Sequence, residues 1–199
     1  MKPELIMLGT GNAMVTKCYN TCFALRNEEE YFLVDAGGGN GILSQLEKAQ
    51  IPFEQIRHMF LTHAHTDHIL GAVWIIRKAA AMMLAETYHG RFTIYCHDEA
   101  AKVLREICEL TLAGKFLKFL GSKIRIQEVK DGGWDTDLRY ACPLFLIYIP
   151  QRRSNLDFER IWRKTFHWYV LVTNRTTAYV SPMWKEQTGC SAKPFVCTV

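Results

Sequence analysis

The pattern of apolar and polar residues predicts alternating strands and helices over residues 1–131. Short apolar runs bounded by glycine or polar turn residues indicate strands, and longer stretches with apolar residues three and four apart indicate helices. The predicted strands are residues 5–8, 22–25, 31–34, 58–61, 92–96 and 123–129, and the predicted helices are 42–50, 69–87 and 98–110. After the hairpin around residues 27–30, strands and helices alternate. This order favours a layered α/β fold over a helical bundle.

One short segment between the fourth strand and the second helix carries four potential metal ligands, namely His63, His65, Asp67 and His68. Side chains two apart on an extended chain face the same way, so His63 and His65 can reach one cation together. Asp67 and His68 are adjacent, lie past the turn that follows the extended segment, and can bind a second cation close by. Neutral imidazole and carboxylate suit zinc, manganese or iron(II). The alternative is a surface loop that happens to hold several histidines.

With this motif the chain resembles the metallo-β-lactamase superfamily and, within it, the ribonuclease Z-like hydrolases. The signature of that family is His-x-His-x-Asp-His on the loop after a buried strand. The resemblance runs from Leu5 to Asp131 and implies the N-terminal half of an αββα sandwich built from two similar halves. It implies a zinc-dependent hydrolase that cleaves a phosphodiester. An esterase or thioesterase on the same scaffold is an alternative, since a metal-bound hydroxide can attack a carbonyl carbon as well as a phosphorus atom.

The resemblance also implies roles for the motif residues. His63 and His65 would bind one zinc ion, and Asp67 and His68 would bind a second; manganese or iron are alternatives to zinc. The two ions share a bridging water, lower its pKa and supply the attacking hydroxide. Asp67 is the implied catalytic residue, because it also orients or deprotonates the attacking water. The remaining ligands of such a site would come from the second half of the sandwich.

Three further features each allow two interpretations. Asp35 ends a strand; the resemblance implies that it supports the metal-binding loop by hydrogen bonding, and the alternative is a turn-forming aspartate. The glycines at 37–39 precede a helix and could cradle a phosphate, but a turn that needs a positive φ is favoured. His97 also ends a strand, where ligands often lie, and a helix-capping or solvated role is favoured. Asn40 is a candidate N-cap for the helix over 42–50.

The distribution of charge along the chain bears on the expected substrate. The net charge is +4, but residues 1–131 hold 15 basic and 15 acidic residues, so the excess lies in residues 132–199, with 9 basic and 5 acidic. The segment with the motif therefore has no overall attraction for phosphate. The expected substrate is RNA or a small phosphodiester or ester. Processing of tRNA is disfavoured, because Ala64 and Thr66 depart from the His-Leu-His-Gly-Asp-His of tRNA-processing members and no basic arm is present.

The chain lacks a cationic start followed by an apolar signal core, and it has no apolar run of 18 residues or more. We therefore expect a soluble cytoplasmic protein without a membrane partner. In that compartment the seven cysteines should be mostly free thiols. The resemblance further implies a homodimer.

Residues 132–199 differ abruptly from the rest and form a predicted second region of uncertain structure. Four of the five tryptophans lie there, and the periodicity of the earlier segments disappears. When codons for residues 145–149 are read from their third base, they allow Phe-Asp-Ile-His, and those for 171–175 allow Gly-Asp-Glu-Pro. Both strings resemble the second half of the family. Our hypothesis is a frameshift near 132–134, and the alternative is a divergent C-terminal domain. With a frameshift, the chain would be a poorly active enzyme or an inactive remnant with a partial metal site.

Overall fold

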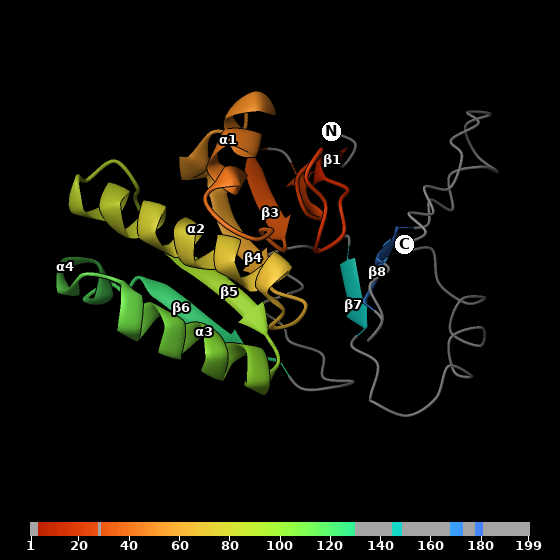
Figure 1. The fold of residues 1–199 in the computed structure, drawn as a ribbon. Coiled ribbons are helices and arrows are strands. Elements are labelled where there is room, and N and C mark those ends of the chain that lie inside the picture. Colours follow the sequence, from red (N-terminus) through yellow and green to blue (C-terminus); the bar gives the residue numbers. More distant parts are fainter. Residues whose placement is uncertain (1–3, 28, 130–144, 149–167, 173–177, 181–199) are drawn as a thin grey trace. The chain divides into compact units, whose positions relative to one another are not determined.

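The structure is a computed structural model that describes residues 4–27, 29–129, 145–148, 168–172 and 178–180. The chain divides into two compact units, Met1–Lys130 and Asp131–Val199. Figure 1 shows the elements of both units, coloured along the sequence. All residues of the His-x-His-x-Asp-His motif lie in the first unit.

The first unit is a six-stranded sheet with its helices placed between strands along the chain. Its strands are β1 (Glu4–Gly9), β2 (Cys22–Asn27), β3 (Glu30–Val34), β4 (Ile56–Phe60), β5 (Phe92–Cys96) and β6 (Ile124–Glu128). Its helices are α1 (Gly41–Lys48), a 3-10 turn η1 (Phe53–Gln55), α2 (Thr66–Leu84), α3 (Asp98–Thr111) and α4 (Gly114–Leu117). The strands lie in sequence order across the sheet. The first two pairings are antiparallel, and those from β3 to β6 are parallel.

The predicted α/β class is confirmed, and every predicted strand and helix is present. One boundary was wrong in a way that matters for the motif, because α2 begins at Thr66 rather than at Ile69. His65 is extended (φ −69°, ψ 149°), and its carbonyl accepts hydrogen bonds from the backbone N–H groups of His68 and Ile69 at 3.0 and 2.9 Å. Asp67 and His68 therefore lie in the first helical turn. The apolar pattern missed this turn because it is polar.

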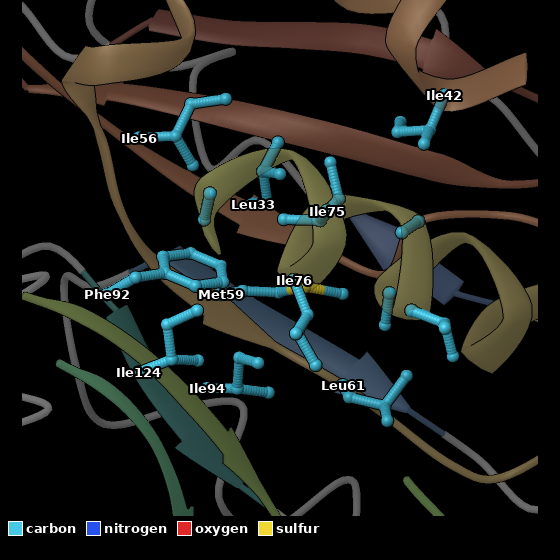
Figure 2. Packing of buried hydrophobic residues seen from close by; sticks show 14 of the residues in the cluster. Leu33, Ile42, Ile56, Met59, Leu61, Ile75, Ile76, Phe92, Ile94 and Ile124 are labelled. Carbon is cyan, nitrogen blue, oxygen red and sulfur yellow. The ribbon is translucent and has the colours of Figure 1, made fainter. Parts of the chain in front are cut away.

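The core lies between the sheet and its helices. Figure 2 shows Leu33 of β3, Met59 of β4 and Ile94 of β5 packed against Ile75 and Ile76 of α2. In a strand, successive side chains point to opposite faces, so Phe32, Phe60 and Tyr95 belong to the other face. They are also buried, each at most 3 % exposed. A sheet buried on both faces explains why these strands are continuous apolar runs rather than alternating ones.

The register between β3 and β4 brings the site together. Val34 pairs with Phe60 in a parallel ladder, so the loops that follow both strands leave from the same edge of the sheet. The backbone N–H of Asp35 donates to the carbonyl of Phe60 at 2.9 Å and extends the pairing by one residue. Asp35 and the motif that starts at His63 are therefore neighbours, although 28 positions separate them in the sequence.

The second unit contains a three-stranded sheet of its own. β7 (Phe145–Tyr148) is parallel to β8 (Trp168–Val172), and β8 is antiparallel to β9 (Ala178–Val180). The proposed frameshift position at 132–134 lies outside the described residues. Within the described part of the chain, no helix combines the length and apolar character needed to cross a membrane.

Candidate metal centre

The first two motif histidines meet as the two-residue spacing predicts. Nε2 of His63 lies 3.1 Å from Nδ1 of His65, and the two ring centroids are 4.5 Å apart. The first of these distances is short enough for a hydrogen bond between the rings. The two ring nitrogens therefore face each other.

Asp67 and His68 form the second pair. Nε2 of His68 lies 3.4 Å from Oδ2 of Asp67, and both side chains are largely buried. The ring of His68 is also close to that of His63, with centroids 4.1 Å apart. The four predicted ligands thus form one continuous cluster at the N-terminus of α2.

A buried carboxylate lies behind this cluster. Asp35 accepts hydrogen bonds from the backbone N–H of Thr62 at 2.9 Å and from Nδ1 of His68 at 2.7 Å. The hydroxyl of Thr62 lies within 2.9 Å of both Asp35 oxygens and 2.8 Å from Nδ1 of His63. The expectation that Asp35 supports the loop by hydrogen bonding is confirmed. Asp35 has φ +57°, a left-handed conformation that aspartate tolerates better than most residues.

Sequence reasoning overlooked Thr62. It was assigned no role from the sequence, although it is 8 % exposed and bonds to both Asp35 and His63. A buried hydroxyl directly before a ligand histidine was the available signal, because buried polar side chains almost always have a hydrogen-bond partner.

The glycine segment at 37–39 forms a turn behind the motif. Gly37 has φ +69°, so the favoured interpretation, a turn that needs a positive φ, is confirmed. The hydroxyl of Tyr19 lies 2.8 Å from the carbonyls of both Ala36 and Gly39 and holds the turn. The carbonyl of Gly37 accepts from the backbone N–H of Gly71 in α2 at 2.8 Å. The turn therefore fixes the start of α2 against the end of β3.

Other candidates have structural roles. His97 is the N-cap of α3, where its Nδ1 accepts from the backbone N–H of Ala100 at 3.4 Å, so the favoured capping role is confirmed. Asn40 occupies the N-cap of α1, but its side chain makes no capping hydrogen bond. The four cysteines within the described ranges, Cys18, Cys22, Cys96 and Cys108, are free thiols.

The environment shifts the pKa values of His63 and His68 in opposite directions. Burial lowers the pKa of His63 to about 4; His68 and His65 add to this effect, and Asp35 and Asp67 oppose it. Burial also tends to lower the pKa of His68, but the hydrogen bond to Asp35 and the charges of Asp35 and Asp67 outweigh it, so that pKa is raised. His63 is therefore neutral at pH 7, the state in which an imidazole binds a metal.

We expect the metal-free chain to lose stability as the pH falls from about 6.5 towards 4 because of His63. In this window the unfolded chain binds a proton at His63 and the folded chain does not, so protonation favours unfolding. His68 acts in the opposite direction, since its raised pKa makes the folded chain bind the proton first. Urea unfolding of the wild type and of His63→Gln, at pH 7 and pH 5, separates the two effects. The wild type should lose more stability than the variant; an equal loss would contradict the shift at His63.

The fold implies metal ions, and the donor set fits them in pairs. Two ligand atoms on a tetrahedral zinc ion, with bonds of about 2.0–2.1 Å, lie about 3.3 Å apart. The separations of 3.1 Å for His63 and His65 and 3.4 Å for Asp67 and His68 are close to this value. In the part of the chain that the structure describes, no group of three or more His, Cys, Asp or Glu side chains is arranged to hold an ion. Each pair thus brings two donor atoms to the spacing that a single ion requires.

Comparison with known proteins identifies the family. Residues 3–117 match the family described as "Anti-Pycsar protein Apyc1". The chain belongs to the Apyc1 family. The match covers more than half of the 199 residues and includes the whole His-x-His-x-Asp-His motif.

Two curated relatives of this Apyc1-family chain are ribonuclease Z proteins. Ribonuclease Z of Pyrococcus abyssi is 29 % identical over 168 residues, covering 79 % of this chain and 52 % of the relative. Ribonuclease Z of Bacteroides thetaiotaomicron is 33 % identical over 128 residues, covering 64 % of this chain and 37 % of the relative. The ribonuclease Z-like grouping inferred from the motif is confirmed. The chain spans about half the length of these relatives, or less.

Solved structures confirm the metallo-β-lactamase fold expected of this Apyc1-family chain. Human tRNase Z, short form, superposes with a TM-score of 0.51 at 23 % identity, covering 64 % of this chain and 44 % of that one. A diphosphatase of the PhnP family also superposes with a TM-score of 0.51, at 16 % identity, covering 65 % of this chain and 51 % of that one. The superpositions thus cover about half of each of these two solved structures.

Proposed function

We propose that this chain derives from a zinc-dependent hydrolase of ribonuclease Z type that cleaves a phosphodiester, in RNA or in a smaller substrate. The observation that carries the proposal is the cluster of His63, His65, Asp67 and His68 at the carboxyl edge of β3 and β4. The ribonuclease Z relatives and the hydrolase fold support the same reaction class. The family description adds interference with a Pycsar system as a biological role to be tested.

The residues of the chain have separate tasks in this proposal. His63 and His65 would hold one zinc ion and His68 and Asp67 the other, with manganese or iron as alternatives. When bound, such ions make hydroxide available at neutral pH and stabilise the negative charge that develops on the phosphate. Asp67 would orient the attacking water and accept its proton at a carboxylate oxygen. Asp35 would keep the ring of His68 in place.

We propose that this activity is impaired, or lost in a remnant with a partial site. Zinc sites usually have three or four protein ligands, whereas each donor pair here provides two. Under the frameshift hypothesis, residues 132–199 would be the out-of-frame counterpart of the region that supplies the remaining ligands.

One observation favours the alternative, a divergent but genuine C-terminal region. The match to the Pyrococcus abyssi relative covers 79 % of the chain, which is more than residues 1–131 provide. Coding DNA that gives early stops when shifted by one base after codon 132 would exclude the frameshift.

The proposed function is tested with the purified full chain. We expect less than two tightly bound zinc ions per chain and a low, zinc-dependent hydrolysis of bis-p-nitrophenyl phosphate that His65→Ala abolishes. His89→Ala, outside the motif, is the matched control and should retain the wild-type rate. Equal residual rates in the wild type and His65→Ala would favour the remnant. Two tightly held zinc ions with full activity would contradict the proposed impairment.

A further inference from the structure

The hydroxyl of Thr62 lies between a buried carboxylate and a ligand histidine. Its oxygen is 2.9 and 2.8 Å from the two oxygens of Asp35 and 2.8 Å from Nδ1 of His63. Thr62 and Asp35 are both buried, at 8 % and 5 % exposed. The buried carboxylate of Asp35 and the ring nitrogen of His63 therefore share the single hydroxyl of Thr62.

The hydrogen atoms in this contact can be counted. A threonine hydroxyl carries one hydrogen, and an ionised carboxylate only accepts hydrogen bonds. The hydroxyl hydrogen of Thr62 must therefore point towards Asp35. The hydroxyl oxygen then has only lone pairs to offer His63, so Nδ1 of His63 must carry the hydrogen in that contact. In a neutral imidazole with a protonated Nδ1, Nε2 has the free lone pair.

We propose that Thr62 is a positioning residue that fixes His63 as the Nδ1–H tautomer and so presents the Nε2 lone pair to the metal position it shares with His65. This inference rests on the proposed metal site. It makes Asp35 the common support of two rings, since Asp35 accepts directly from Nδ1 of His68 and through the Thr62 hydroxyl from Nδ1 of His63. Both rings then turn Nε2 towards the ligand cluster. Hydrogen-bond partners of this kind set the tautomer of ligand histidines.

The tautomer can be measured in the wild-type, metal-free full chain. Long-range 1H–15N spectra of histidine-labelled protein at about pH 8, above the ordinary pKa of imidazole, distinguish protonated from unprotonated ring nitrogens. The signal that disappears in His63→Gln identifies His63. We expect its Nδ1 to be protonated and its Nε2 unprotonated. A spectrum with Nε2 of His63 protonated would overturn the inference, and this test needs no variant of Thr62.

Three threonine variants test the consequence for metal binding. Thr62→Val keeps the shape and removes the hydroxyl, Thr62→Ser keeps the hydroxyl, and Thr87→Val removes an exposed hydroxyl that bonds the carbonyl of Met82. In competition titrations with zinc we expect Thr62→Val to bind about 10–100-fold more weakly than the wild type. Thr62→Ser and Thr87→Val should bind like the wild type. The His63 signal should become a tautomer mixture only in Thr62→Val.

The outcomes separate this inference from the proposed function. Wild-type zinc affinity in Thr62→Val, or a weakening of the same size in Thr62→Ser, would contradict the role of the hydroxyl. If Thr62→Val does not fold, the tautomer of His63 in the wild type and the zinc titration of Thr62→Ser still test the role of the Thr62 hydroxyl. Failure of the wild type to bind any zinc would refute the proposed metal site, whereas the tautomer of His63 would still support or overturn the role of Thr62.

Discussion

Replacing Asp35 by asparagine is expected to lower the free energy of unfolding of the metal-free chain by about 3–5 kcal/mol, because several buried hydrogen bonds to a charged acceptor, each worth about 1.5–3 kcal/mol, are weakened or lost. Asparagine tolerates the left-handed φ of this position as well as aspartate does, so the backbone should be unaffected. The loss would come from the carboxylate, which receives hydrogen bonds from Thr62 and His68. A loss of this size is a large part of the stability of most domains.

Urea unfolding measures this effect, with Glu128→Gln as the matched control. Glu128 also forms an ion pair, with Arg105 at 2.8 Å, but both side chains are substantially exposed. Exposed pairs contribute about 0–1 kcal/mol, so Glu128→Gln should differ little from the wild type. The importance assigned to Asp35 would be refuted by equal losses in the two variants. Zinc affinity should fall together with stability only in Asp35→Asn.

The second large effect is expected at Gly71, where an added methyl group has no room. A Cβ at Gly71 would lie 1.8 Å from the carbonyl oxygen of Ala36 and 2.8 Å from that of Gly37. Both atoms belong to backbone that the Tyr19 hydroxyl and the sheet hold in place. We therefore expect Gly71→Ala to destabilise the chain by about 3 kcal/mol or more, at the upper end of overpacking effects. Urea unfolding again provides the measurement.

Gly114→Ala is the matched control, since Gly114 is also helical and an added Cβ there meets nothing within 4 Å. In open helical positions alanine is favoured over glycine by about 1 kcal/mol, so this variant should be neutral or slightly stabilising. If Gly71→Ala were equally well tolerated, the turn at 36–37 would have to be far less rigid than its hydrogen bonds indicate.

The sequence predicted those features whose cause is local. The hairpin of β2 and β3 follows from two apolar runs around a polar turn, and the contact between His63 and His65 follows from the two-residue period of an extended chain. The start of α2 is also a local feature, but it was misplaced. Its first turn, Thr66 to His68, has no apolar residue, so the periodicity begins only at Ile69.

The support of the ligands could not be predicted in detail because it depends on the pairing of β3 with β4. Only the register of Val34 with Phe60 shows that Asp35 reaches Thr62 and His68, which lie 27 and 33 positions further along the chain. Thr62 illustrates the limit. Its position before His63 is visible in the sequence, but the partner that orients its hydroxyl comes from another strand.

Among the residues that the structure describes, the groups that hydrogen-bond to the motif histidines and their loop come from the continuous stretch between Asp35 and Gly71. Altering residues outside this stretch should therefore leave the directions of these donors unchanged. This stretch orients the donor side chains before any ion binds. A polypeptide supplying the complementary donors, whether fused or added separately, would meet imidazoles that already point the right way.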